Sequence, residues 1–295
     1  MLKNLKRIGS IAIIILLLPY VATVFINGVD IKSDKPENTL YIKVRTSSKD
    51  AEVPIDEYGI GILAKELPDV YDDEAVKAQA ILVRTGIYKK LQDKGEQVVF
   101  EEDFWSTKDM EAYWGGSQYE KRYQQIVKAW EDTGEMVITY EGSLAITPYH
   151  QLSNGKTRNG NEVLSSEAYP YLVSKDCPDD VEAEEQLQTA EIDFMDCEVV
   201  ECDSADYVLM VKCGEENISG EDFRKTYGLK SGCFTVQEQD GKLRITTKGI
   251  GHGLGMSQYT ANKMAKADKT YTEILQYFFE KTEIKEVSEI LEISE

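Results

Sequence analysis

An uncharged apolar run near the N-terminus constrains this chain more than any other feature of its sequence. Residues 8–26 are dominated by Ile, Leu and Val and contain no charged residue. As a helix that rises about 1.5 Å per residue, such a run spans roughly the 30 Å of bilayer hydrocarbon. The sequence therefore predicts one N-terminal transmembrane helix, with the remaining chain folded on one side of the membrane.

The charges that flank this run predict its orientation. Lys3, Lys6 and Arg7 precede it, whereas acidic residues dominate the stretch that follows, and basic residues favour the cytoplasmic side. We therefore expect a cytoplasmic tip and anchor in residues 1–29 and a spacer in residues 30–39. The protein would be a single-pass protein of the cell membrane with its folded part outside the cytoplasm. A cleaved signal peptide is the alternative, but the run is longer than a usual signal core and no clear cleavage site follows it.

The charge balance bears on the choice of partner. The 295 residues include 33 basic and 53 acidic ones, for a net charge of −20. Without the three basic residues of the tip, 30 basic and 53 acidic residues give the rest of the chain a charge of −23. We expect no nucleic-acid partner, because phosphate contacts need a basic face. Any other polyanion would need a locally basic cleft.

Five cysteines lie close together in the second half of the chain. They are Cys177, Cys197, Cys202, Cys213 and Cys233. Outside the cytosol, one or two disulfides among them are expected, and the odd number leaves at least one thiol free or paired between chains. The acidic, cysteine-rich residues 177–231 are expected to form an inserted lobe. The lobe would belong to one domain of residues 40–285, followed by a tail of residues 286–295.

Hydrophobic periodicity predicts an α+β fold. Strand patterns cover residues 40–46, 135–140, 143–149, 207–212, 233–237 and 243–247, and helix patterns cover 55–67, 72–91 and 118–132, with further helix starts at Ser219 and Thr270. The order is irregular and lacks the strand–helix–strand cadence of a doubly wound sheet. We therefore expect helices packed beside irregular antiparallel sheets around a substrate cleft.

One candidate for chemistry is a helix pair that carries Glu66 and Arg84. Glu66 ends an apolar helix just before Pro68, and Arg84 lies in the middle of the next helix. A short turn would fold the helices back on each other and bring both side chains toward a common cleft. Apolar surroundings raise the pKa of a carboxyl group, which suits a general acid, whereas a close arginine opposes that shift. The alternative is a structural salt bridge between the two helices, which this pattern alone favours.

Two further segments carry candidate binding residues. Residues 249–255 contain four glycines around His252, which let the backbone approach a ligand ahead of a helix whose amides can bind an anion or a sugar hydroxyl; the alternative is a plain tight turn. Ser153 and Lys156 follow a predicted strand and can bind carbohydrate or serve as ordinary loop residues. His150 and Cys177 are too few ligands to predict a metal site.

These three segments, in this order, resemble the stage II sporulation protein D family. The resemblance runs from about residue 40 to residue 284. The family comprises membrane-anchored lytic transglycosylases that remodel peptidoglycan during engulfment of the forespore. The resemblance thus implies a lyase that degrades cell wall during sporulation. It would cleave the bond between N-acetylmuramic acid and N-acetylglucosamine and leave 1,6-anhydro ends.

The resemblance also implies roles for single residues. Glu66 falls on the catalytic acid and base, and Arg84 falls on an arginine of the active cleft. The remaining motif positions fall on Ser153, Gly155, Lys156, Thr157, His252, Ser257 and Gln258. In the implied reaction the muramic 6-hydroxyl is the nucleophile, so that no second enzymic carboxylate is needed. Arg84, Lys156 and the loop amides would hold the sugar and its lactyl carboxylate.

Cofactor and partners follow from the same resemblance. Some family members bind zinc through histidines and cysteines near the middle motif. His150 stands there, but no cysteine or second histidine follows closely, so we expect no metal and no other cofactor. Besides glycan strands and the cytoplasmic membrane, the implied partners are a peptidoglycan amidase and a membrane scaffold of the engulfment machinery. The alternatives are a non-catalytic peptidoglycan-binding or amidase-enhancing subunit, and a hydrolase that leaves reducing ends.

Overall fold

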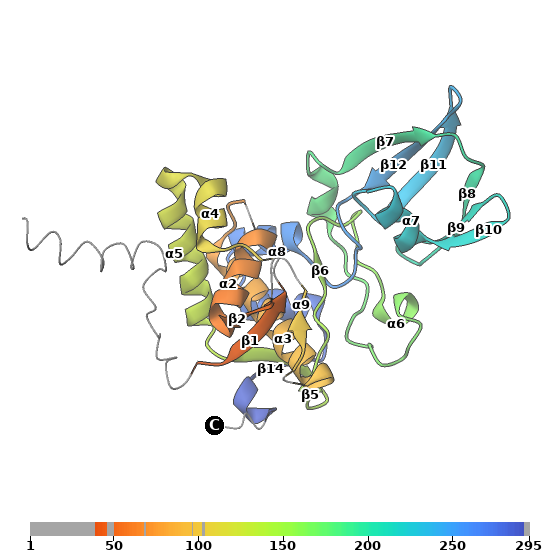
Figure 1. The fold of residues 1–295 in the computed structure, drawn as a ribbon. Coiled ribbons are helices and arrows are strands. Elements are labelled where there is room, and N and C mark those ends of the chain that lie inside the picture. The colour runs from red at the N-terminus through yellow and green to blue at the C-terminus, as the bar shows by residue number, and fades with distance from the viewer. Residues whose placement is uncertain (1–38, 46–49, 68, 96, 102–103, 292–295) are drawn as a thin grey trace, which may run out of the picture. The chain divides into compact units, whose positions relative to one another are not determined.

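The structure is a computed structural model that describes residues 39–45, 50–67, 69–95, 97–101 and 104–291. The chain divides into two units, Met1–Thr39 and Leu40–Glu295, and the predicted anchor of residues 8–26 lies outside the described residues. Among the helices that are described, none combines the length and the apolar character needed to cross a membrane. All elements labelled in Figure 1 belong to the second unit.

The predicted α+β class is confirmed by a mixture of helices and small open sheets (Figure 1). The helices are α2 (Ile55–Glu66), α3 (Asp73–Lys94), α4 (Thr107–Trp114), α5 (Gly116–Asp132), α6 (Gly160–Val163), α7 (Gly220–Thr226), α8 (Gln258–Lys266) and α9 (Tyr271–Phe278), with 3₁₀ turns η1 (Pro178–Glu182) and η2 (Val287–Glu289). The strands packed with the long helices are β1 (Tyr41–Arg45), β2 (Asp50–Pro54), β3 (Val99–Phe100), β4 (Met136–Tyr140), β5 (Ser143–Leu144), β6 (Tyr149–His150), β13 (Met256–Ser257) and β14 (Glu283–Glu286). They form three of the described sheets, ordered β2-β1-β3, β14-β4-β5 and β13-β6.

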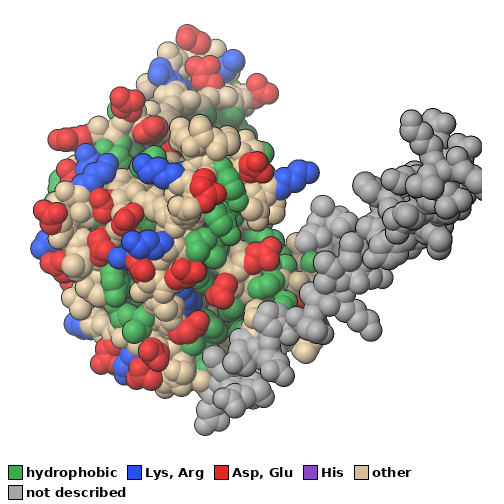
Figure 2. Space-filling model, turned by 90° about the vertical axis from the view of Figure 1, so that its left-hand side faces the viewer, with side chains coloured by type: hydrophobic (Ala, Val, Ile, Leu, Met, Phe, Trp, Pro, Cys, Tyr) green, Lys and Arg blue, Asp and Glu red, His purple; other side chains and the backbone are tan. Residues whose placement is uncertain are grey.

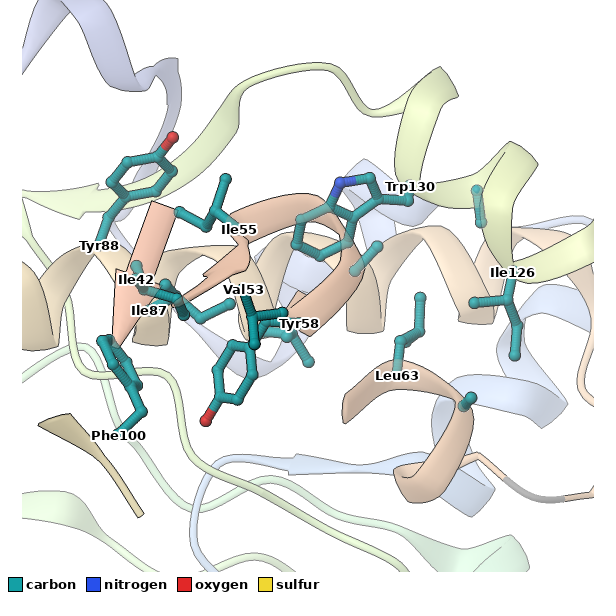
Figure 3. Close-up of a cluster of buried hydrophobic side chains, with 14 of the residues drawn as sticks. Ile42, Val53, Ile55, Tyr58, Leu63, Ile87, Tyr88, Phe100, Ile126 and Trp130 are labelled. Atoms are coloured by element: carbon teal, nitrogen blue, oxygen red, sulfur yellow. The ribbon is translucent and has the colours of Figure 1, made fainter. Parts of the chain in front are cut away.

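One hydrophobic core joins the β1–β2 hairpin to helices α2, α3 and α5 (Figure 3). Tyr58 and Leu63 of α2 are fully buried in it, and the Tyr58 ring meets that of Phe100 at 5.3 Å between centroids. Gly59 lets α5 come close, because a Cβ atom there would lie 2.2 Å from the Trp130 ring. The apolar stripe predicted for this helix thus fixes the helix against its neighbours.

The acidic second half forms two further three-stranded sheets. Their strands are β7 (Leu187–Asp193), β8 (Cys197–Cys202), β9 (Val208–Cys213), β10 (Glu216–Ser219), β11 (Cys233–Gln239) and β12 (Lys242–Lys248), in the orders β10-β9-β8 and β11-β12-β7. Both sheets share a hydrophobic cluster with α7. Because β12 pairs with β7, these sheets take in residues beyond the predicted lobe of 177–231. We call residues 177–248 the sheet lobe.

One disulfide joins neighbouring strands of the sheet lobe. It links Cys197 of β8 to Cys213 of β9. The other described cysteines are free thiols, with Cys177 and Cys233 buried and Cys202 exposed. The expectation of one or two disulfides with an unpaired remainder is therefore confirmed.

Local sequence signals located several element boundaries. Asp72, Ser219 and Thr270 each accept a hydrogen bond from the first turn of the helix that follows, as their N-cap chemistry predicts. Gly142 and Gly241 both adopt positive φ in the turns that join β4 to β5 and β11 to β12. The sequence prediction missed several short elements, namely β2, β3, α4, α6, β7, β8, β10, β13 and β14. It also treated residues 143–149 as one strand, where the structure has β5 and β6 separated by an extended stretch.

Candidate active site

A groove of about 720 Å³ runs between helices α2 and α3. Its walls are one face of α2, the second half of α3, the segment of residues 145–149 and Leu254 from the glycine-rich loop. The volume falls in the range of ligand-binding clefts. All three segments singled out in the sequence therefore meet at or near this groove, although they lie up to about 190 positions apart.

Glu66 is the exposed carboxyl group at the mouth of this groove. It is the last residue of α2, and its side chain is exposed and lines the groove. Surrounding protein raises the pKa of Glu66 through desolvation, and the nearby Lys65 ammonium partly opposes this effect. The site thus favours a carboxyl group that holds its proton to higher pH than usual, which suits a general acid.

Two side chains from distant helices hold the backbone at Glu66. The Gln258 amide donates to the Glu66 carbonyl oxygen at 3.4 Å and to Gln79 Oε1 at 3.3 Å. Arg122 of α5 donates to the carbonyl oxygens of Leu67 and Asp69 just beyond. Gln258, predicted to bind substrate, is 3 % exposed and instead positions the end of α2.

Lysine side chains give the groove a local positive charge. Lys65, Lys89, Lys90 and Lys94 line it, against two lining carboxylates, Glu66 and Asp93. Asp93 is paired with Lys89 at 2.5 and 2.7 Å. The groove is therefore basic within a strongly acidic chain, as recognition of a polyanion would require.

Arg84 does not point into the groove, which corrects the prediction for this residue. Its side chain is 2 % exposed and donates to the Trp130 carbonyl at 2.8 Å, to Thr133 Oγ1 at 3.1 Å and to the Met136 carbonyl at 3.3 Å. The guanidinium carbon lies 4.0 Å above the Trp130 ring. Arg84 therefore satisfies the carbonyl end of α5, and neither the shared cleft nor the Glu66–Arg84 salt bridge is found between these two described residues.

The buried carboxylate of Asp180 joins the middle motif to the glycine-rich segment. Asp180 Oδ2 accepts from the Ser153 backbone N–H and the Ser257 hydroxyl, each at 2.7 Å. Its Oδ1 accepts from the Thr260 hydroxyl at 2.5 Å. Ser153 and Ser257, both predicted to bind substrate, are fully buried. Their hydrogen bonds to Asp180 hold the loops beside the groove together, and their side chains do not reach the groove surface.

Lys156 and Thr157, the other residues of the middle motif predicted to bind substrate, also form their hydrogen bonds within the protein. Thr157 is 1 % exposed, and its hydroxyl accepts from the Lys175 backbone N–H at 2.9 Å. The Lys156 ammonium donates to the Ser204 carbonyl at 2.9 Å and lies 3.7 Å from Asp206. Lys156 therefore ties the motif to the sheet lobe, whereas Thr157 ties it to the segment just before the lobe. Neither residue lines the groove.

The glycine-rich segment is packed against the sheet lobe. The Tyr207 ring fills the space beside Gly253, where a Cβ atom would lie 2.2 Å from Cζ of the tyrosine. Arg158 pairs with the buried carboxylate of Asp203, donates to the His252 carbonyl at 3.2 Å and lies over the Tyr207 ring at 5.1 Å. Loop and lobe therefore form one packed unit.

The two histidines of the chain are brought together, but their surroundings do not fit zinc. The rings of His150 and His252 lie 5.9 Å apart, and burial lowers the pKa of His150 to about 3 and that of His252 to about 4. His150 Nε2 is buried without a partner. Within the described part of the chain, no group of three or more His, Cys, Asp or Glu side chains can hold a metal, whereas protein zinc sites use three or four such ligands.

Sequence reasoning missed the residues that hold this site together. Asp180, Arg122 and Asp203 each make several buried hydrogen bonds. Asp180 directly follows Asp179 in a proline-initiated turn. Acidic turns on protein surfaces have the same pattern, so this pattern does not single Asp180 out. The role of these residues depends on partners 27 to 80 positions away in the sequence and was not readable locally.

Fold and site together define an α+β protein in which an exposed carboxyl group of raised pKa lies in a basic groove. Residues 45–140 match the family described as stage II sporulation protein, SpoIID. The chain is 32 % identical over 273 residues to stage II sporulation protein D of Bacillus amyloliquefaciens, covering 84 % of this chain and 79 % of that protein. It is 31 % identical over 274 residues to the Bacillus subtilis protein of the same name, with the same coverage. The chain therefore belongs to the stage II sporulation protein D family.

A more distant relative carries a different name. The amidase enhancer of Bacillus subtilis is 25 % identical over 289 residues, covering 74 % of this chain and 39 % of that protein. The family resemblance inferred from the three motifs is thus confirmed, together with a place in sporulation.

Proposed function

We propose that this protein is a lytic transglycosylase that cleaves the bond between N-acetylmuramic acid and N-acetylglucosamine in peptidoglycan glycan strands during engulfment. The observation that carries the proposal is Glu66, an exposed carboxyl group of raised pKa in a groove of about 720 Å³. The open groove accommodates a polymer, and the carboxyl group is poised as an acid.

The reaction asks one carboxyl group to act twice. Protonated Glu66 donates its proton to the glycosidic oxygen as the bond to C1 breaks. The resulting carboxylate accepts the proton of the muramic 6-hydroxyl as that oxygen bonds to C1, which restores the acid and leaves a 1,6-anhydro end. The only other carboxylate that lines the groove among the described residues, Asp93, is paired with Lys89, which supports a mechanism with one enzymic carboxyl group.

The lysines of the groove fit the same substrate. Muramic acid carries a lactyl carboxylate, and Lys65 and Lys90 lie on opposite walls beside Glu66 and Phe100. An ammonium group near the scissile bond attracts that carboxylate and aligns the sugar. This local charge takes over the role that the sequence analysis gave to Arg84 and Lys156.

We further propose that the folded part acts outside the cytoplasmic membrane, anchored by residues 8–26. The Cys197–Cys213 disulfide supports an oxidising compartment. A peptidoglycan amidase and a membrane scaffold are the proposed partners. No step is assigned to a metal or other cofactor.

A mass-spectrometric assay tests the activity. The full-length chain in detergent is incubated with purified glycan strands, and Glu66→Gln is compared with Asp93→Asn, a carboxylate change in the same groove. We expect 1,6-anhydro ends with the unchanged chain and with Asp93→Asn, and a loss of at least about 100-fold with Glu66→Gln. Reducing ends would instead indicate a hydrolase, and unchanged cleavage by Glu66→Gln would overturn the assignment.

A non-catalytic role is the second candidate, because one relative is named an amidase enhancer. In that case the chain would bind glycan strands and stimulate an added amidase without forming new ends. The stimulation would survive Glu66→Gln, whereas a transglycosylase that feeds the amidase would lose it.

A further inference from the structure

Three aromatic side chains gather beside the groove, and we call Trp105, Tyr113 and Trp114 the aromatic ledge. The Trp105 ring lies 4.6 Å from Tyr113 and 5.9 Å from Trp114, measured between centroids. Tyr113 is 59 % exposed, and the two tryptophans are half-buried. Figure 2 looks onto the side where α4 and α5 lie in Figure 1 and shows hydrophobic side chains exposed there among charged ones. A cluster of exposed aromatic rings is typical of a binding surface.

The aromatic ledge adjoins the α2 end of the groove. The Trp105 backbone N–H donates to the Gly61 carbonyl at 3.2 Å, and Gly61 lies between Tyr58 and Ile62, which both line the groove. Gly61 and Glu66 are five positions apart on this helix, or about 7.5 Å along its axis. The ledge is therefore packed on the same helix that carries Glu66.

A polar hollow lies beside the ledge. It measures about 510 Å³ and is formed by residues 70–73 and the first half of α5. Its lining includes Gln118, Gln125 and Arg122, and the Arg122 guanidinium carbon lies 5.7 Å from the Trp114 ring. Because the Gln125 amide bonds to Tyr71, Asp73 and Arg122, the amide that the hollow offers to a ligand is that of the exposed Gln118.

We propose that the aromatic ledge and the adjoining polar hollow form a secondary glycan-binding site that holds sugar rings remote from the bond at Glu66. A pyranose ring presents a face of C–H groups, which packs on an aromatic ring, and a rim of hydroxyls, which paired donors and acceptors of amide side chains bind. Both elements occur here side by side, next to the helix that carries Glu66. The proposal rests on the proposed function for its ligand class, a peptidoglycan glycan strand.

Remote binding would let long strands bind more tightly than short ones. A sugar ring on the ledge adds contacts away from the scissile bond. An octasaccharide long enough to reach the ledge therefore gains more affinity from these contacts than a tetrasaccharide confined to the groove. Chain-length dependence is thus the property that separates this site from the groove itself.

Binding is tested on the full-length chain carrying Glu66→Gln, in detergent, so that no cleavage is required. Isothermal titration measures binding of a tetrasaccharide and an octasaccharide of alternating N-acetylglucosamine and N-acetylmuramic acid. The variants compared are Tyr113→Ala and Tyr113→Phe. The control is Phe194→Ala, because Phe194 is 50 % exposed in the sheet lobe. We expect Tyr113→Ala to weaken octasaccharide binding about fivefold or more. Tyr113→Phe and Phe194→Ala should bind as the parent does, with equal unfolding midpoints for all.

Three results would overturn the aromatic ledge as a glycan site. One is unchanged octasaccharide affinity in Tyr113→Ala, and another is an equal loss for both oligosaccharides. The third is a loss of amidase binding in Tyr113→Ala with glycan affinity intact, which would make the surface a protein interface. Because binding is measured without turnover, the ledge is tested even if Glu66 proves not to be catalytic, and cleavage by Glu66→Gln would count against the proposed function alone.

Discussion

Replacing Arg84 by methionine should destabilise the protein and leave substrate binding unchanged. The three hydrogen bonds of its buried guanidinium reach Trp130, Thr133 and Met136. Bonds from a charged donor contribute about 1.5 kcal/mol each at the low end, or about 4.5 kcal/mol together. Desolvation by burial lowers the pKa of Arg84, so the buried charge itself costs free energy. Removing the charge removes this cost and offsets part of that sum. We expect a net loss of about 3 kcal/mol in the free energy of unfolding.

Urea unfolding measures this loss. For a chain of this size the denaturant slope is about 3 kcal/mol per molar, so the midpoint should fall by about 1 M. Arg45→Met is the matched control, because Arg45 is 54 % exposed and forms only surface ion pairs. Its free energy of unfolding should change by no more than about 0.5 kcal/mol.

Glycan kinetics decide whether the reasoning holds. If Arg84 serves only the carbonyl end of α5, the KM of the folded Arg84→Met protein should match that of the parent. A tenfold rise in KM with the urea midpoint unchanged would show that the guanidinium reaches the substrate, and the structural role given to it here would be wrong.

Two further predictions concern the site. The pKa of Glu66 lies above its ordinary value of 4.5 in the folded protein, so its contribution to stability is present below pH 4.5 and is lost as pH rises through the raised pKa. Glu66→Gln should therefore have a higher urea midpoint than the parent at pH 7 and an equal one at pH 4, and a lower midpoint at pH 7 would contradict the desolvation. Gly253 and Gly142 have similar φ of 78° and 76°, but only at Gly253 would a Cβ atom meet the Tyr207 ring. Gly142→Ala should cost about 1 kcal/mol from backbone strain and Gly253→Ala at least about 2 kcal/mol more; equal losses in thermal unfolding would mean that the ring moves aside freely.

The sequence located the catalytic candidate because its signals are local. The apolar stripe of α2, its acidic first turn and its end at Glu66 all lie within 12 residues, and caps such as Thr270 depend only on the next few residues. The order of the three motifs was enough to identify the family. The structure places Glu66 at the end of this helix, where it lines the groove.

The direction of Arg84 could not be derived in this way. Every residue from 78 to 85 is buried, so α3 lacks a single apolar face, and periodicity cannot tell which neighbour each side chain meets. Only the position of α5 decides that the guanidinium caps that helix.

Asp180 illustrates a different limit. It is one of sixteen acidic residues among positions 177–231, and in composition it cannot be told from its solvated neighbours. Its function depends on three donors brought to it from positions 27 to 80 residues away. Buried charge of this kind is set by tertiary packing, on which local patterns carry no information.

The packing of Tyr207, Asp203 and Asp180 against the middle motif and the glycine-rich segment has a consequence for protein engineering. A shortened version without residues 177–231 would strip the acceptors from Arg158, Ser153 and Ser257 and leave an unpaired guanidinium in the interior. Chimaeras between relatives should therefore exchange residues 177–231 together with residues 153–158 and 249–260, so that each buried donor keeps the acceptor of its own parent protein.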